Sequence, residues 1–180
     1  GQPLILWNQR WEYDKNPDLF FETLFKLAEE GLDFEAAICG EAFGKRPLIF
    51  EQAAAQLKNR IIHMGFAEQD QYERLLWQAD IVVSTALHEF FGISIVEAIG
   101  CHTKPILPNR LSYPEILGTH EEKSSFFYHT DEELYQRLKE AIQEVSTSEP
   151  RRNEESISVE RYQWDKIAPK YDSLFTSLQN

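Results

Sequence analysis

The chain has 180 residues, with 18 lysines and arginines against 30 aspartates and glutamates, so its formal net charge is −12. A hydrophobic share of 42% supports one buried core, which argues against a disordered chain and predicts a single domain with a short appendage. The negative charge predicts that this domain alone binds nucleic acid poorly, because such binding depends on Lys and Arg neutralising phosphates.

The two cysteines and the hydropathy pattern argue against a disulfide-rich protein, a zinc protein and a membrane-spanning protein. Cys39 and Cys101 lie in apolar surroundings without a CxxC pair, which predicts neither a disulfide framework nor a zinc site and favours a reducing, cytoplasmic compartment. No apolar stretch approaches the roughly 20 residues that span a bilayer, and the first residues do not resemble a signal peptide. We therefore expect no membrane insertion.

Short apolar runs alternate with longer amphipathic stretches along the chain, which predicts alternating strands and helices. The predicted strands, in chain order, are Leu4–Trp7, Phe34–Cys39, Ile61–Met64, Ile81–Ser84, Pro105–Leu107 and Ser125–Phe127. The predicted helices are Asp18–Glu30, Pro47–Asn59, Glu68–Gln78, Gly92–Cys101, Tyr113–Leu117 and Asp131–Val145. This order predicts an α/β fold, a Rossmann-like domain of three layers with a mostly parallel sheet.

A change in composition divides the chain near its end. Residues 1–145 carry the alternating pattern, and residues 146–180 begin with a polar stretch that contains Pro150 and is typical of a linker. Aromatic residues return from Val159 to Leu178 at helical spacing, which predicts a helical tail with one apolar face. That tail packs back on the domain or against a partner outside this chain.

In an open parallel sheet, ligands bind beyond the carboxyl ends of the strands. After the first predicted strand, Arg10 and Lys15 lie in a loop just before a helix, an arrangement that suits a diphosphate. The alternative is that both are ordinary loop cations that pair with Glu12 and Asp14.

The loop after the fourth predicted strand carries a second candidate anion-binding site. Gly92 lets a backbone approach a ligand, and the N–H groups from Gly92 through Ile95 at the start of a helix can hold phosphate oxygens. Glu97 falls on the same face as Ser94, where a carboxylate suits the two hydroxyls of a ribose. The alternative is a half-exposed helix glutamate. Glu89 is a loop carboxylate able to reach a sugar hydroxyl.

Two further loops follow the third and second strands. Backbone groups at Met64, Gly65 and Phe66 could read the edge of a base, although a solvent-facing turn is the more usual meaning of such a segment. Residues 39–44 form a glycine-flanked loop that lies against a nucleotide or merely connects a strand to a helix.

Several other chemistries lack their motifs. No histidine follows His88 at the spacing of a zinc protease, and neither GxSxG, GxGxxG nor GxxxxGK[ST] occurs. No Asp-x-Asp is present to hold a diphosphate through a metal. The five histidines, at 63, 88, 102, 120 and 129, show no ligand-like spacing. We therefore expect neither a metal nor a cofactor.

The spacing from Glu89 to Glu97, with Phe91 and Gly92 between them, resembles the EX7E motif of the retaining GT-B glycosyltransferases of family 4. The strand and helix order resembles the C-terminal, donor-binding half of that fold. The resemblance implies that Arg10 and Lys15 hold the donor diphosphate, that Glu97 binds the ribose and that Glu89 contacts the transferred sugar. The backbone of Phe91, Gly92, Ile93 and Ser94 would then contact sugar and phosphate oxygens.

Three segments, residues 7–17, 84–92 and 108–116, resemble more specifically the subgroup that transfers mannose from GDP-mannose to queuosine in tRNA. This implies a nucleotide-sugar donor, no metal, and an N-terminal domain that binds the acceptor, tRNA included. Gln9 stands where the family commonly has glycine, and His102 to Pro105 replace its usual Gly-x-Pro. The alternatives are a transferase with a lipid or polysaccharide acceptor, a non-catalytic nucleotide-sugar sensor, or a structural module.

Overall fold

The computed structural model describes residues 1–87, 92–109 and 126–148. Six parallel strands form its sheet, in the spatial order β3-β2-β1-β4-β5-β6. The strands are β1 (Leu4–Trp7), β2 (Glu35–Cys39), β3 (Ile61–Gly65), β4 (Ile81–Val83), β5 (Lys104–Pro108) and β6 (Phe127–Tyr128). The chain order reverses direction beside β1, so the crevice expected to bind ligands opens at the carboxyl ends of β1 and β4.

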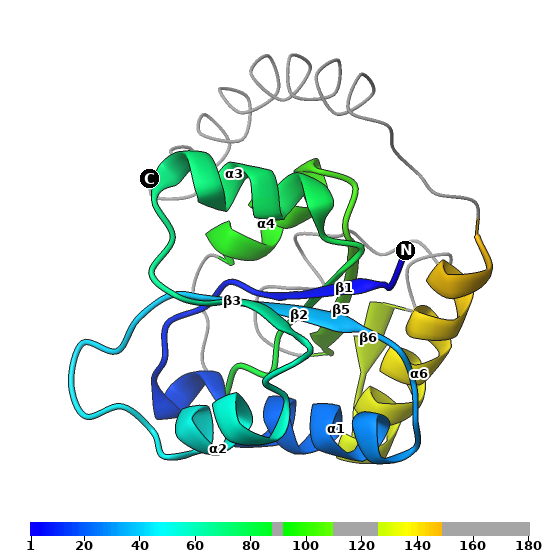
Figure 1. Ribbon diagram of the computed structural model, residues 1–180, viewed down its shortest axis with the longest axis horizontal. Coiled ribbons are helices and arrows are strands. Elements are labelled where there is room, and N and C mark those ends of the chain that lie inside the picture. The colour runs from blue at the N-terminus through cyan, green and yellow to red at the C-terminus, as the bar shows by residue number, and fades with distance from the viewer. Residues whose placement is uncertain (88–91, 110–125, 149–180) are drawn as a thin grey trace.

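Helices cover both faces of the sheet, as Figure 1 shows. The helices are η1 (Tyr13–Lys15), α1 (Pro17–Glu29), α2 (Ile49–Gln56), α3 (Gln69–Gln78), α4 (Ile93–Gly100) and α6 (Asp131–Thr147). One apolar core joins the sheet to α1, α2 and α6, and a second joins it to α3 and α4. This arrangement confirms the predicted three-layer α/β domain, with a described sheet that is parallel throughout.

Alternation along the strands explains the two cores. In β1, Ile5 and Trp7 point into the core that contains α1, whereas Leu4 and Leu6 point into the core that contains α3. All four side chains are at most 5% exposed, because a parallel sheet covered on both faces must be apolar on both. Both cysteines are buried, and neither forms a disulfide in the described part of the chain, as the sequence predicted.

Local signals place the helix ends near the predicted positions. Pro17 occupies the first turn of α1, and Gly31, with a φ of +82°, follows its end. α2 is shorter than predicted, because a turn closed by the Arg60 N–H on the Leu57 carbonyl at 2.7 Å follows it. α6 extends to Thr147, two residues beyond the predicted end.

Two predicted segments fall wholly or partly beyond the described ranges. The helix predicted at Tyr113–Leu117 and the tail from Val159 to Leu178 lie outside the described residues, as do residues 149–180 of the predicted appendage. Within the described ranges, no helix combines the length and apolar character needed to cross a bilayer.

Candidate functional site

Two loops at the carboxyl edge of the sheet are tied together by backbone-directed hydrogen bonds. The Thr85 hydroxyl, after β4, donates to the carbonyls of Lys15 at 2.7 Å and Asn16 at 2.8 Å. The Leu87 N–H donates to the Asp14 carbonyl at 2.7 Å. Thr85 is fully buried, so these bonds are shielded from water. The loop after β1 is therefore fixed beside the segment that leads to residue 89.

The two predicted diphosphate cations differ in burial. Lys15 is only 5% exposed, and its Nζ lies 4.0 Å from Asp14 Oδ2. Arg10 is 56% exposed at its side chain, with Nη1 3.6 Å from Glu12 Oε2. The ion pairs named as the alternative are thus present, but both are long. A buried ammonium at this edge is the stronger anion-binding feature, because low local polarity strengthens its field.

The start of α4 lies at the same edge. Gly92 is its N-cap with a left-handed φ of +59°, a conformation that favours glycine. No described residue accepts a hydrogen bond from the backbone N–H of Ile93 or Ser94. The Ile95 N–H, in contrast, donates to the Gly92 carbonyl at 3.1 Å, so the prediction that it is available to a phosphate is wrong.

The buried Asn8, which follows β1, is hydrogen-bonded to both α3 and α4. Asn8 Nδ2 donates to the Ser94 carbonyl at 2.7 Å and to the Tyr72 hydroxyl at 3.2 Å. These bonds fix the orientation of the amide, because a carbonyl can only accept. Asn8 Oδ1 is buried and has no hydrogen-bond partner among the described residues. The contact holds the first turn of α4 against the end of β1.

Glu97 follows Ser94 by three residues in α4, so the two share one side of that helix. The Glu97 side chain is half-buried. The pKa of Tyr72 is raised, mainly by the burial of its own hydroxyl and next by the negative charge of Glu97. Tyr72 is itself bonded to Asn8, so Glu97 belongs to the surroundings of the β1 end and the α4 start. The contact of Glu97 with ribose hydroxyls stays a prediction.

At the end of β3, Met64 is half-buried and pairs with β2, Gly65 has a φ of +130°, and Phe66 is 61% exposed. The Gly65 carbonyl accepts from the Gly40 N–H at 3.0 Å and lies 2.9 Å from His63 Nε2. That carbonyl can only accept, so His63 Nε2 carries the proton. The turn is internally bonded, and the exposed Phe66 ring is its ligand-accessible feature.

The loop after β2 approaches the loop after β1 closely. A Cβ on Gly40 would lie 2.7 Å from the Gln9 carbonyl and 3.4 Å from two atoms of the Trp11 ring. The backbone N–H of Trp11 donates to the Glu41 carbonyl at 3.2 Å. Residues 39–44 therefore do more than connect a strand to a helix, because they support the segment that carries Arg10.

Not every predicted site residue can be placed. Glu89, Phe91 and His88 lie outside the described residues. Those that are described come from the loop after β1, from the end of β3 and the residue after it, and from α4 and its N-cap: Arg10, Lys15, Met64, Gly65, Phe66, Gly92, Ile93, Ser94 and Glu97. Sequence reasoning missed Asn8, Tyr72 and Thr85. The available signal was a polar residue directly after a buried strand, which applies to Asn8 and nearly to Thr85.

Comparison with known proteins adds independent findings. Residues 1–161 match the family model described as "Glycosyl transferases group 1". The chain is 35% identical over 173 residues to the tRNA-queuosine alpha-mannosyltransferase of Drosophila melanogaster, covering 95% of this chain and 45% of that protein. It is 27% identical over 117 residues to a GDP-mannose-dependent alpha-(1-6)-phosphatidylinositol dimannoside mannosyltransferase of Mycobacterium tuberculosis, covering 64% of this chain and 30% of the relative.

The fold is also found in solved structures. The C-terminal domain of the group 1 glycosyl transferase LpcC from Francisella tularensis superposes with a TM-score of 0.65 at 18% identity. That match covers 94% of this chain and 86% of the other. The chain thus spans less than half the length of the two curated relatives named above, but nearly all of a single GT-B domain.

Proposed function

The chain belongs to the group 1 glycosyltransferase family, and from this premise we propose that it is the donor-binding domain of a retaining mannosyltransferase that uses GDP-mannose. The observation that carries the proposal is 35% identity along 95% of the chain to a protein named as an alpha-mannosyltransferase. The name of the mycobacterial relative includes GDP-mannose as donor, which supports the choice of nucleotide.

The residues at the carboxyl edge take the roles that their chemistry suits. Arg10 and Lys15 bind the diphosphate, and the backbone N–H groups of Ile93 and Ser94 add donors without charge. Negative charge grows on the diphosphate as it leaves, so these groups stabilise the transition state more than the ground state. The reaction then needs no metal.

The two glutamates act on hydroxyl groups. Glu97 accepts hydrogen bonds from the ribose, and Glu89 contacts the transferred mannose. Phe66 covers one face of the guanine, with backbone groups at Met64 and Gly65 nearby. The spacing of Glu89 and Glu97 fits the EX7E motif of family 4. A two-carboxylate hydrolase mechanism would require a nucleophile beside the anomeric carbon. The transfer proposed here assigns that role to no residue.

The acceptor assignment concerns the whole protein. We propose that an N-terminal domain completes the cleft and that the acceptor is queuosine in tRNA, as the name of the Drosophila relative says of that protein. With a charge of −12 on this domain, most of the basic surface for tRNA must lie on the other one. A lipid acceptor is the second candidate, because the mycobacterial relative is named for a phosphatidylinositol substrate.

Calorimetric titration of this chain tests the donor assignment. The affinity of the unaltered chain is measured for GDP, GDP-mannose, UDP, UDP-glucose and ADP. The affinity for GDP is also measured with two substituted chains. We expect selective binding of the guanosine ligands, weakened about tenfold or more by Arg10→Ala and by Glu97→Gln, because each removes a charged hydrogen-bonding group. The matched controls are Arg74→Ala on α3 and Glu29→Gln at the end of α1, both exposed and neither among the proposed site residues.

Equal affinity for all nucleotides, or equal losses in the variants and their controls, would contradict the donor site. Transfer is then assayed with the full-length protein, GDP-mannose and tRNA that carries queuosine, with the mass of the modified nucleoside as readout. EDTA should leave the rate unchanged. Labelling of a phosphatidylinositol lipid in place of tRNA would favour the second candidate, and donor binding without transfer to any acceptor would favour a nucleotide-sugar sensor.

A further inference from the structure

The β2–α2 loop, residues 40–48, carries side chains that the donor site does not use. Phe43 is 73% exposed, the highest value among the large apolar side chains described. Lys45 and Arg46 are exposed, and among the described residues no carboxylate pairs with either. The same loop contains the exposed Glu41, so Lys45 and Arg46 give it a small positive charge beside an aromatic ring, on a chain with a charge of −12.

The base of this loop packs against the segment after β1. Arg46 Cζ lies 4.7 Å above the Trp11 ring, which stacks on Phe50 at 4.3 Å between ring centroids. The backbone N–H of Trp11 donates to the Glu41 carbonyl at 3.2 Å, and Gly40 packs against the Gln9 carbonyl. The loop is therefore anchored to the segment that carries Arg10, so a partner bound on it lies next to the donor site.

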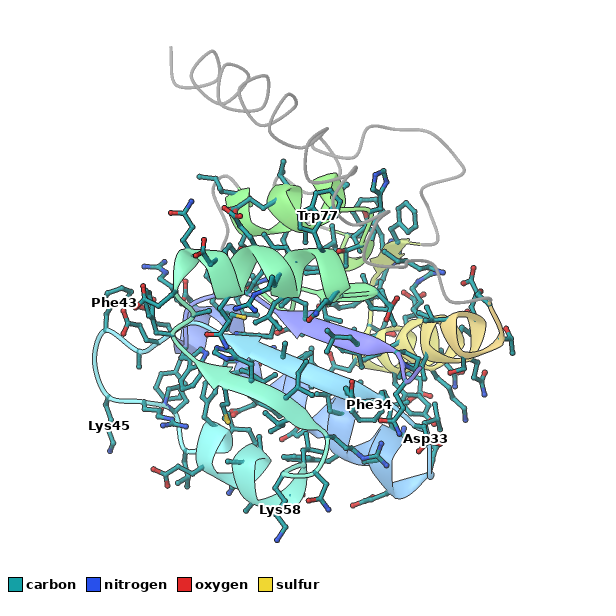
Figure 2. All side chains as sticks on the ribbon, turned by 45° about the horizontal axis from the view of Figure 1, so that its top comes forward. Asp33, Phe34, Phe43, Lys45, Lys58 and Trp77 are labelled. Carbon is teal, nitrogen blue, oxygen red and sulfur yellow. The ribbon has the colours of Figure 1, made fainter. Side chains whose placement is uncertain are left out.

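The tip of the loop points away from the domain. Figure 2 shows Phe43 and Lys45 on the part that projects beyond the carboxyl edge of the sheet, whereas Lys58 lies elsewhere, below α2. Lys58 follows α2 and precedes β3, which places it at the amino edge of the same sheet. An exposed ring beside two cations can stack on an unpaired base while the cations contact its phosphates.

We propose that the β2–α2 loop is a contact surface for a single-stranded segment of RNA, with Phe43 stacking on a base and Lys45 and Arg46 binding phosphates. This inference rests on the proposed function, in which tRNA is the acceptor. The loop contributes to RNA binding by the whole protein and does not replace a basic N-terminal domain. It gives the acidic donor domain a defined part in holding the acceptor close to the sugar.

The charge distribution favours RNA over a membrane. At physiological salt, exposed charges are screened beyond about 8 Å, so a narrow strand on the loop experiences mainly Lys45 and Arg46. A flat anionic bilayer would face much more of the acidic surface, and electrostatic membrane binding commonly uses clusters of about four to eight cations. Two cations and one ring fit a nucleotide strand better than a lipid surface.

The test uses the full-length protein with Phe43→Ala or Lys45→Glu, and Lys58→Glu as the matched charge reversal. Binding of fluorescein-labelled, queuosine-containing tRNA is followed by anisotropy over a range of salt concentrations. We expect Lys45→Glu to weaken binding about fivefold or more and to reduce the salt slope by about 0.7, the value for one phosphate contact in a single strand. Phe43→Ala should weaken it about 5- to 100-fold, as loss of one stacked base does.

The controls separate this surface from the donor site. Lys58→Glu should change tRNA affinity less than twofold, and all three variants should bind GDP-mannose as the unaltered protein does. Equal losses from Lys45→Glu and Lys58→Glu would mean that only net charge matters and would overturn the proposal. So would weaker GDP-mannose binding with normal tRNA binding, or variant-sensitive binding to phosphatidylserine vesicles in place of tRNA.

A parallel assay separates this proposal from the proposed function. The unaltered full-length protein is tested for mannose transfer to the same tRNA. If it transfers mannose and the Lys45→Glu protein behaves like the Lys58→Glu protein, only the loop surface is wrong. If it neither binds nor modifies tRNA while binding GDP-mannose, the tRNA acceptor is wrong and the loop surface falls with it.

Discussion

Gly40 offers a direct test of how the donor edge is built, because two effects of its replacement can be separated. Its φ is +121°, and an added Cβ would lie 2.7 Å from the Gln9 carbonyl, a backbone atom that cannot rotate away. Gly31 has a φ of +82°, but a Cβ there meets nothing within 4 Å. Gly31→Ala therefore reports backbone strain without a close contact, whereas Gly40→Ala combines the strain of its larger φ with a close contact.

The structure sets the magnitudes. A left-handed alanine costs about 1–2 kcal/mol, which we expect for Gly31→Ala. In Gly40→Ala the Gln9 carbonyl must also move, and it accepts the bond from Trp7 Nε1 at 3.0 Å. Leaving that buried indole N–H without its partner costs about 1–3 kcal/mol more, so the total is about 2–5 kcal/mol.

Urea unfolding measures both variants through the transition midpoint at constant slope. Gly40→Ala should also weaken GDP binding several-fold, because the displaced backbone leads directly into Arg10, whereas Gly31→Ala should not. Equal losses of stability in the two variants would refute the close-contact argument. Full stability loss with unchanged GDP affinity would show that the Arg10 segment does not depend on Gly40 for its position.

Three further predictions address a cation, an acid and a thiol. Lys15→Met should lower GDP affinity about 10- to 150-fold, as loss of a charged hydrogen bond does, with Lys58→Met unchanged in the same titration. Hydrogen bonds from Lys139 and then Tyr135 hold the pKa of Glu30 below its ordinary value of 4.5, so this carboxylate stabilises the fold above about pH 4.5 and loses that contribution as the pH falls through its folded value. Glu30→Gln should thus flatten the acid decline of the urea midpoint between pH 6 and pH 3, and a decline as steep as that of the unaltered chain would contradict this. Burial raises the pKa of the Cys39 thiol to about 12, so Ellman's reagent at pH 8 should label it only on unfolding, and immediate labelling of the folded chain would contradict the burial.

Much of the fold follows from local sequence signals. Leu4–Trp7 was predicted as a strand with the observed ends, because four consecutive apolar residues are bounded by Pro3 and Asn8. The parallel sheet needed only the alternation of strands and helices, whereas the strand order came from the structure. Strand ends elsewhere shifted by a residue or two, as for β5, which begins at Lys104 and includes Pro108.

The site was predictable only in part, for a physical reason. The residues that follow buried strands can be found from the sequence, since the carboxyl edge of a parallel sheet is known in advance. The hydrogen bonds that position them cannot, because Asn8 meets Ser94 and Thr85 meets Lys15 across 86 and 70 residues. The burial of Lys15 was missed too, because it depends on how distant segments pack around the loop after β1.

These long-range bonds also prepare the edge for an anion. The carbonyls of Lys15 and Asn16 are occupied by Thr85, and the Ser94 carbonyl is occupied by Asn8. Carbonyl oxygens would repel a diphosphate, and here they are directed into neutral hydrogen bonds within the protein. The N–H groups of Ile93 and Ser94 have no acceptor among the described residues. In the proposed function, neutral side chains hold the loops while the positive field of the edge acts on the donor diphosphate, a preorganisation that favours a developing negative charge.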